Sequence, residues 1–245
     1  MFYKYTKKQR RFIKIAKDIY HINSIKEIEQ PFNTLAVGIR GSGKTTKLAL
    51  MVVFSKVDSI SSEYEEQNSC IVSNTNRQSQ ALINTINNII KIFEMEYKKR
   101  YNERLFYSVQ NLKQPNIIYI NNHQIRFMVD SITHTEGIQW KKFKDIYIDE
   151  FQLSISKLED SILKNLIKNG VISKYNIKTH LFGTDEGMRI IEAVRLFMSE
   201  EVPLKVEQMK LDRLSYTVGI DKKKNKIWNA VKKAISNVRE FLLLK

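Results

Sequence analysis

Apolar positions along the chain fall into blocks with two different spacings, and the blocks predict helices and strands in turn. Over residues 6–22 apolar side chains return every three or four positions, which indicates a helix with one buried face. A second stretch with this spacing follows Arg77 and runs to about Arg100, and it predicts a long helix. Short apolar runs of strand length lie outside these helices, at 34–37, 69–73, 145–148 and 178–182.

Two further apolar runs, 117–120 and 124–129, flank the polar residues Asn121, Asn122 and His123 and predict a β-hairpin. Elsewhere strands and helices alternate, which predicts an α/β fold with a mostly parallel central sheet and helices on both faces. In such folds the ligand binds at the carboxyl ends of the strands. A ligand site is therefore expected where the strands end.

Composition changes near Pro203, and this change suggests two parts of unequal size. Residues 1–203 are expected to form the main domain, and residues 204–245 a basic helical tail or linker subdomain. Within the tail, apolar residues recur at helical spacing: Ile227, Val231, Ile235, Val238 and Leu242. This stripe predicts a packing face, with a helix lying on a membrane surface as the alternative.

The chain is strongly basic, with a formal net charge of +15 at pH 7 over 245 residues. Such a surface favours a polyanionic partner, nucleic acid first and an anionic membrane second. Basic residues of the N-terminal helix and of 222–226 are candidates for contacts with phosphates. A Lys-rich proteome encoded by an AT-rich genome would raise the charge without any such function, so charge alone does not decide between these readings.

Several function classes are excluded by what the chain contains. A single cysteine, Cys70, rules out a disulfide framework and a cysteine-based zinc site. It lies in an apolar run and is expected to be a small core residue. No apolar run reaches the length of a membrane span, and the basic N-terminus lacks the apolar stretch of a signal peptide. We therefore expect a protein that works inside a cell, without a membrane partner.

A complete phosphate-binding loop follows the predicted strand at 34–37 and precedes a predicted helix. It fits the pattern G-x-x-x-x-G-K-[ST]. The residues expected to bind a nucleotide are Gly38, Ile39, Arg40, Gly41, Ser42, Gly43, Lys44, Thr45 and Thr46. Backbone amides and the helix N-terminus would surround the phosphate oxygens, Lys44 would reach the β- and γ-phosphates, and Thr45 would offer a hydroxyl to Mg²⁺. The alternative is a glycine-rich turn that binds nothing.

Nucleotide hydrolysis needs more than a phosphate loop, and a pair of carboxylates supplies it. Asp149 and Glu150 end the predicted strand 145–148. Asp149 would hold Mg²⁺ beside Thr45, while Glu150 would orient and deprotonate the attacking water. The alternative is an ordinary solvated turn, but the upstream phosphate loop would then lack the carboxylates that hydrolysis needs.

Three other residues are candidates for the same site. Arg40 lies inside the loop, where its guanidinium could stabilise charge on the γ-phosphate, or it simply faces solvent. Thr184 ends the next predicted strand, which is otherwise a plain glycine-containing strand exit. Gln9 carries an amide that could pair with the adenine edge, or it is a solvated helix glutamine.

Taken in order, these residues resemble the ATPase domain of large terminase subunits, the DNA-packaging motors of tailed phages. The resemblance covers about residues 1–200 and rests on the loop with its arginine, the polar strand end at 73–75, the Gly137 segment, and the Asp149–Glu150 pair. It implies a P-loop NTPase of the additional-strand (ASCE) type. It also implies that Arg40 is an arginine finger acting in the same chain, Glu150 the catalytic base, Thr184 the residue that couples hydrolysis to motion, and Gln9 an adenine contact.

The resemblance further implies ATP and Mg²⁺ as cofactors and double-stranded DNA as cargo. Its motors act as homo-oligomeric rings, often pentamers, on the portal of a procapsid in the cytoplasm of a phage-infected bacterium. Terminases usually add an RNase H-like nuclease domain, and the stretch after Asp185 is too short for one. Either this is the motor domain of a longer protein or a packaging ATPase that cuts no genome, and we expect no nuclease activity.

Two other functions remain open on sequence grounds. One is another DNA-dependent ATPase of this fold, such as a helicase-like or loader protein, although helicases carry a second ATPase-like domain for which the chain is too short. The other is a nucleotide-regulated DNA-binding switch with negligible turnover. Glu150 separates the enzymes from the switch, because a binding switch has no need of that carboxylate.

Overall fold

The computed structural model describes residues 5–22, 28, 33–58, 68–112, 116–135, 137–157, 161–184, 187–199 and 201–208. Its strands are β1 (Asn33–Val37), β2 (Asn68–Ser73), β3 (Val109–Leu112), β4 (Ile117–Ile120), β5 (His123–Val129), β6 (Phe143–Asp149), β7 (Lys178–Gly183) and β8 (Leu204–Gln208). Its α-helices are α1 (Lys7–Tyr20), α2 (Lys44–Phe54), α3 (Asn76–Tyr101), α4 (Phe151–Ser156), α5 (Ile162–Lys168), α6 (Val171–Tyr175) and α7 (Gly187–Ser199). Two 3-10 helices, η2 (Ile132–Thr135) and η3 (Trp140–Lys142), precede β6.

All eight strands join one sheet in the order β3-β4-β5-β2-β6-β7-β1-β8. Every pair from β5 to β8 is parallel, whereas β3, β4 and β5 pair antiparallel at one end. The predicted mostly parallel sheet is therefore confirmed. Because β7 lies between β6 and β1, an extra strand separates the phosphate-loop strand from the strand that ends in Asp149, as the additional-strand type requires.

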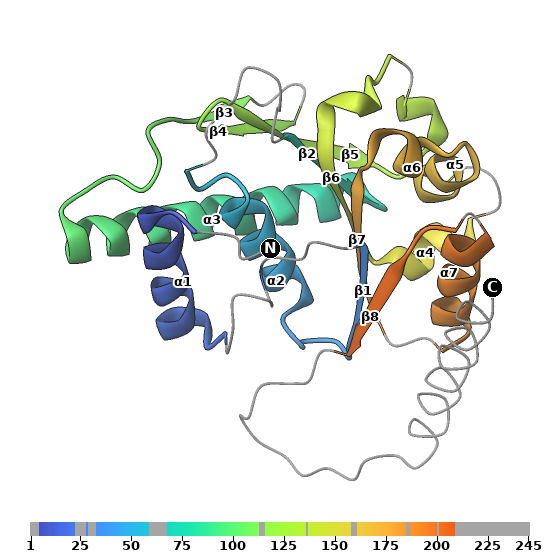
Figure 1. Ribbon diagram of the computed structural model, residues 1–245, viewed down its shortest axis with the longest axis horizontal. Coiled ribbons are helices and arrows are strands. Elements are labelled where there is room, and N and C mark those ends of the chain that lie inside the picture. Colours follow the sequence, from blue (N-terminus) through green and yellow to red (C-terminus); the bar gives the residue numbers. More distant parts are fainter. Residues whose placement is uncertain are drawn as a thin grey trace, which may run out of the picture.

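Helices cover both faces of this sheet (Figure 1). Helices α1, α2 and α3 lie on one face, over side chains such as Ile71 and Tyr147. Helices α4 to α7 lie on the other, over Cys70 and Ile148 among others. Neighbouring strand residues point to opposite faces, so continuous apolar runs fill two cores at once. This explains why the parallel strands read as unbroken apolar blocks in the sequence.

The predicted hairpin is formed by β4 and β5. Asn121 and Asn122 make its two-residue turn with φ values of 54° and 66°. Two successive left-handed residues match the twist of the flanking strands, and asparagine tolerates that conformation better than most residues. The sequence signal for this hairpin was thus a direct consequence of the turn geometry.

The sheet extends beyond the boundary expected at 203. Strand β8 pairs in parallel with β1, with Leu35 opposite Val206. The boundary expected at 203 would place the five residues of β8 in the tail, whereas they are part of the sheet. The predicted tail helix with its apolar stripe and the basic run 222–226 lie outside the described residues, as does most of the polar loop expected at 58–68.

A buried polar chain crosses the sheet near the beginnings of the strands. Lys56, fully buried after α2, donates to Ser69 Oγ at 2.7 Å. Burial lowers its pKa to about 8, although the charge of Asp145 acts in the opposite direction. Burial also acts to raise the pKa of Asp145, but His180 and Lys56 lower it overall. His180 in turn contacts Thr34, with Nδ1 and Oγ1 2.9 Å apart. These polar contacts connect the end of α2 to the four strands β2, β6, β7 and β1.

Membrane crossing requires a long, apolar helix, and none occurs within the described ranges.

Candidate functional site

The phosphate loop leaves the carboxyl end of β1 and enters α2. Gly41 and Gly43 have φ values of 83° and 80°, in the region where side chains are strained, so both positions favour glycine. A backbone bond from Gly38 N to Gly183 O (3.1 Å) ties the start of the loop to the end of β7. Since α2 begins at Lys44, its unpaired N-terminal amides face the loop, as an anion site needs.

The loop's polar side chains fit a nucleotide phosphate chain. Lys44 is buried, and its Nζ donates to the carbonyl oxygens of Gly38 (2.9 Å) and Ile39 (3.0 Å), so the ammonium group curls over the loop. Ser42 Oγ is buried without a hydrogen-bond partner. A buried, unpaired hydroxyl is costly unless an acceptor arrives, and phosphate oxygens are such acceptors.

An open cavity of about 700 Å³ lies beside the loop. Its lining comes from the loop, from the end of β6 and from the residue that follows β7: Arg40, Gly41, Gly43, Lys44, Thr45, Thr46, Glu150 and Thr184. The structure thus brings together eight of the residues that the sequence singled out, although the stretches that carry them lie far apart in the chain. Their meeting follows from the strand order, which places β7 between β6 and β1.

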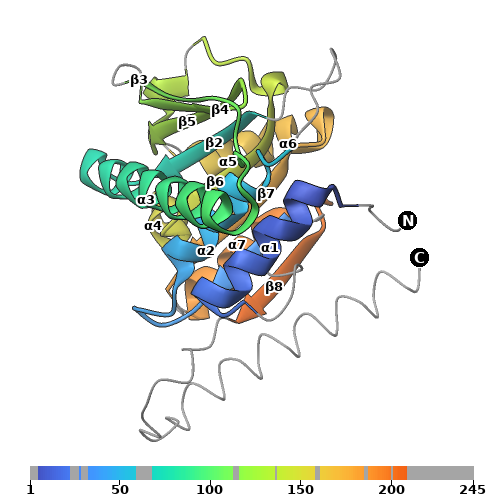
Figure 2. The ribbon, with the colours of Figure 1, turned by 90° about the vertical axis from the view of Figure 1, so that its left-hand side faces the viewer.

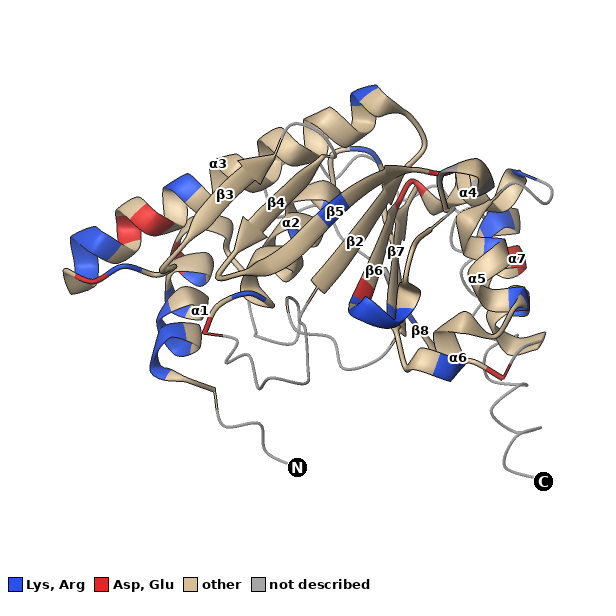
Figure 3. Cartoon of the chain, turned by 90° about the horizontal axis from the view of Figure 1, so that it is seen from above, with Lys and Arg blue, Asp and Glu red and all other residues tan. Residues whose placement is uncertain are grey.

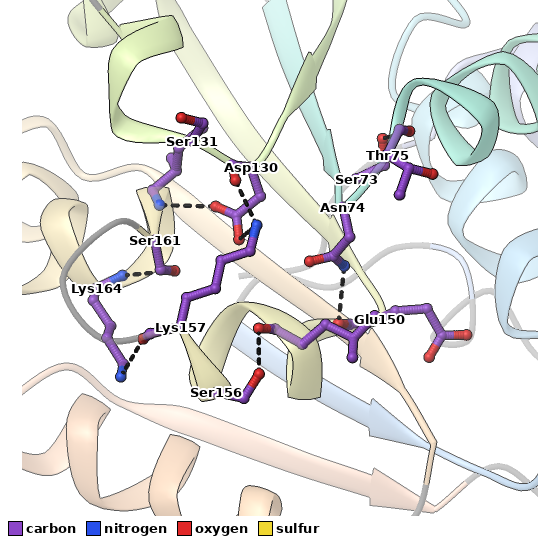
Figure 4. Close-up of polar contacts among 12 residues, drawn as sticks. Ser73, Asn74, Thr75, Asp130, Ser131, Glu150, Ser156, Lys157, Ser161 and Lys164 are labelled. Atoms are coloured by element: carbon purple, nitrogen blue, oxygen red, sulfur yellow. Dashed lines mark hydrogen bonds and ion pairs between the residues drawn. The ribbon is translucent and has the colours of Figure 1, made fainter.

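Glu150 is held in an unusual backbone conformation at the end of β6. Its φ and ψ are 52° and 51°, in the left-handed region. Asn74, which directly follows β2, donates its side-chain amide to the carbonyl oxygens of Asp149 and Glu150, both at 3.3 Å (Figure 4). Asn74 therefore braces the backbone that carries the two carboxylates, and it does so from the residue before the N-cap of α3.

The carboxylate of Glu150 is also held by side chains. Its Oε2 accepts a hydrogen bond from Gln152 Nε2 and a longer one from Thr184 Oγ1, at 3.4 Å. Gln152 packs over Gly183, where an added Cβ would lie only 2.2 Å from Gln152 Oε1. Glycine at 183 therefore makes room for the side chain that orients Glu150.

Asp149 is a desolvated carboxyl group. It is buried, and burial together with the neighbouring Glu150 raises its pKa to about 6, although Lys44 acts to lower it. A carboxylate in such surroundings gains from a nearby cation. Within the described part of the chain, no three or more His, Cys, Asp or Glu residues cluster as a metal cage. Thr45 lines the cavity and Asp149 does not, so a magnesium site shared by Asp149 and Thr45 stays a prediction.

Gln9 is placed differently from the other candidates. Its Oε1 accepts from Thr6 N (3.0 Å) in the capping box of α1, and its Nε2 donates to Val57 O (3.2 Å). It does not line the cavity. In this conformation the amide joins α1 to the end of α2, so its role as an adenine contact stays a prediction that requires both bonds to open.

Sequence reasoning missed the contacts that Gln152 and Asn74 make. Gln152 stands two residues after Glu150, so proximity was visible, but the direction of its side chain depends on α4 beginning at Phe151. Asn74 was noted only as part of a polar strand end. That β2 lies directly beside β6 is what brings its amide to Asp149.

A phosphate loop, two carboxylates at the end of β6 and an intervening parallel strand define the fold of P-loop ATPase domains. No family model matches the chain, and no curated protein matches it. Among solved structures, the HK97 bacteriophage large terminase has 11% identity and a TM-score of 0.51, over 96% of this chain and 49% of that one. The yeast DEAD-box splicing factor Prp28 has 12% identity and a TM-score of 0.51, over 93% and 56%.

A Thermus phage large terminase ATPase domain has 11% identity and a TM-score of 0.42, over 74% of this chain and 65% of that one. The chain thus spans about half the length of the HK97 and Prp28 structures and less than two thirds of this one. At these identities the likeness to the two structures with the higher score shows a shared fold and nothing finer.

Proposed function

We propose that the chain is an ATP-hydrolysing motor that moves double-stranded viral DNA into a procapsid, as the ATPase domain of a large terminase does. One observation carries the enzymatic part of this proposal: Glu150 lines the same cavity as Lys44 and Thr45. A carboxylate facing a phosphate-binding loop is the group that a nucleotide hydrolase needs.

Hydrolysis by this site would proceed by in-line attack of water on the γ-phosphorus of ATP. Glu150 accepts the proton of the attacking water, a bond forms between the water oxygen and phosphorus, and the bond to the ADP oxygen breaks. Lys44 and Arg40 stabilise the negative charge that develops on the phosphate oxygens. Mg²⁺, bound by Asp149 and Thr45, would neutralise further phosphate charge.

Coupling to motion is assigned to Thr184. Its hydroxyl contacts Glu150, and it follows β7, the strand between the two halves of the site. A change at the γ-phosphate would therefore reach Thr184 and Gln152 together. Gln9 is proposed to contact adenine once its present hydrogen bonds open.

The proposed partners follow from charge and from the terminase resemblance. A formal charge of +15 suits double-stranded DNA. The resemblance adds a portal, a procapsid and a homo-oligomeric ring, a pentamer in many terminases, working in the host cytoplasm. No nuclease activity is proposed for the chain.

A helicase-like, nucleic-acid-dependent ATPase is the second candidate. One observation favours it as much as the first: the DEAD-box factor and the HK97 terminase have the same TM-score. The two candidates differ in their preferred activator, because a packaging motor acts on duplex DNA whereas a helicase-like protein acts on a strand that it separates or remodels.

ATP turnover by wild type and Glu150→Gln, with and without duplex DNA, tests the proposal. Loss of the base should lower the turnover number by about 10²- to 10⁴-fold while nucleotide binding persists. Glu192→Gln, which neutralises a carboxylate on α7, is the matched control and should leave turnover unchanged.

Equal turnover by wild type and Glu150→Gln would refute the enzyme and leave the nucleotide-regulated switch. Turnover that is fast but indifferent to duplex DNA and portal would contradict the packaging motor. Stimulation by single strands alone would favour the helicase-like candidate.

A further inference from the structure

Helix α1 presents a stripe of positive charge to solvent. Lys7, Arg10, Lys14 and Lys17 are all exposed and follow one another at intervals of three or four residues. Residues so spaced share one face of a helix. The buried residues of α1, which are Phe12, Ile15 and Ala16, lie on its other side. Over ten residues the stripe extends about 15 Å.

The C-terminal end of α3 continues this charge. Lys98, Lys99 and Arg104 are exposed there, and α1 packs beside α3 (Figures 2 and 3). We call these residues and the four of α1 the α1–α3 basic surface. With charges coloured, blue Lys and Arg segments lie on α1, and on this part of α3 they flank a red acidic segment (Figure 3).

The α1–α3 basic surface is held as a rigid unit. Phe12 stacks on Phe93 with ring centroids 4.0 Å apart. Arg11 lies over the ring of Tyr101, 4.1 Å from its centroid, and binds Glu103 at 2.9 Å. Aromatic stacking and a cation–π contact fix the two helices to each other, so the backbone positions that carry the cations keep a constant spacing.

The acidic residues of this region are already occupied. Glu103 pairs with Arg11 and Lys7, while Asp18 and Glu96 both pair with Arg100. Within the described residues no ion pair engages six cations of the surface: Arg10, Lys14, Lys17, Lys98, Lys99 and Arg104. Surface charges usually alternate in sign, so an excess of one sign on a rigid face attracts a ligand of the opposite sign.

We propose that the α1–α3 basic surface binds the phosphate backbone of duplex DNA. The inference rests on the proposed function for the kind of polyanion, and it adds a second contact region that none of the cavity residues belongs to. A row of flexible cations without interspersed base-reading groups suits binding that ignores sequence.

Nucleic acid suits this surface better than an anionic membrane does. A helix that lies on a membrane inserts an apolar face between the lipids. The apolar face of α1 is unavailable, because Phe12, Ile15 and Ala16 are fully buried against the domain. Only the cations of the stripe remain for binding, and no apolar side chain lies between them.

The test compares the full chain with the triple variant Arg10→Gln, Lys14→Gln, Lys17→Gln, without nucleotide, by fluorescence anisotropy with a labelled duplex. Loss of three phosphate contacts should weaken binding at least about tenfold near 0.1 M salt. It should also reduce the slope of log K against log salt by about 3. Glutamine keeps α1 helical, and an unchanged circular-dichroism spectrum and basal ATP turnover exclude misfolding.

A control variant removes the same charge elsewhere. Lys141, Lys142 and Lys174 are exposed on η3 and α6, on the other side of the sheet from α1. Their triple replacement by glutamine should change affinity by less than about twofold. Equal weakening by both triple variants would mean that only net charge matters and would overturn the proposal, as would unchanged binding by the α1 variant.

Vesicles with anionic headgroups provide the remaining arm. A loss of vesicle binding in the α1 variant with duplex affinity intact would assign the surface to a membrane and reject the proposal. Since binding is measured without ATP, its failure leaves the turnover test of Glu150 untouched, and inactive Glu150→Gln protein can still bind duplex through α1.

Discussion

At the scale of single residues, the side chains of Gln152 and Thr184 hold the carboxylate of Glu150 in place. Gln152 donates to its carboxylate, and the absence of a side chain at Gly183 leaves space for that contact. Gln152 is therefore a positioning residue that orients the carboxylate of Glu150.

Replacing Gln152 by alanine should lower kcat for ATP by roughly tenfold and leave KM nearly unchanged, because ground-state phosphate contacts stay in place. Ser156→Ala, which removes an exposed hydroxyl of the same short helix, is the control. An unchanged kcat in Gln152→Ala, or an equal loss of kcat in Ser156→Ala, would contradict this role of Gln152.

At the scale of elements, the ends of the strands are tied to short helices by buried polar groups. Asp130, just after β5, accepts from the amide of Ile162 at the start of α5 (2.8 Å) and from Lys157 Nζ (3.2 Å) (Figure 4). Its carboxylate is almost fully buried, whereas the Lys157 side chain is 31% exposed. The bond to the backbone amide therefore matters more than the ion pair.

Asp130→Ala should reduce the free energy of unfolding by about 2–3 kcal/mol, because it leaves the buried Ile162 amide without its acceptor and leaves the Lys157 ammonium only the backbone carbonyl oxygen of residue 130. Asp130→Asn, which retains an acceptor oxygen, should lose less. Lys157→Ala should cost no more than about 1 kcal/mol. Urea unfolding followed by circular dichroism checks these values, and a larger loss in Lys157→Ala than in Asp130→Ala would contradict the ranking.

Elements with a repeated spacing were predictable, and short ones were not. The long helix and the parallel strands gave clear apolar patterns, and the hairpin gave a turn signal. Helices α4, α5 and α6 have only six, seven and five residues, too few to repeat a helical period. Strand β8 follows Pro203, where composition pointed to a new segment, and only its pairing with β1 identifies it as part of the sheet.

At the scale of the whole molecule, the buried side chain of Lys56 links separate elements of the domain. Lys56 connects α2 to β2 and lies in the field of Asp145 on β6. Its pKa of about 8 lies below the value near 10.4 of an unfolded chain. Between these two values the unfolded state binds more protons, so the free energy of unfolding attributable to Lys56 rises with pH.

From pH 7.5 to 9.5 the Lys56 contribution should rise by about 2 kcal/mol. Cys70 acts in the opposite direction, because burial raises its pKa to about 12 and the unfolded thiol ionises first. The contribution of Lys56 is therefore the difference between wild type and Lys56→Met, measured by urea unfolding at both pH values. Parallel pH dependences in the two proteins would show that Lys56 does not titrate in this range.

The phosphate loop and the Asp149–Glu150 pair were visible in the sequence because each is a contiguous stretch with a fixed spacing. The bonds around them were not, because they join residues from different strands. Asn74 reaches Asp149 across 75 positions, and Thr184 reaches Glu150 across 34. Such contacts depend on strand order and side-chain direction, which no local pattern records.

The left-handed backbone at Glu150 lowers the stability of the fold at the residue to which hydrolysis is assigned in the proposal. A residue with a Cβ in that region costs roughly 1–2 kcal/mol, and glycine would relieve it. Domains of this size have a free energy of unfolding of only about 5–15 kcal/mol, so this strain is an appreciable fraction of it. Glycine at 150 would stabilise the fold but would remove the carboxylate that the proposed hydrolysis requires, so the strain retained at Glu150 agrees with a functional role for this residue.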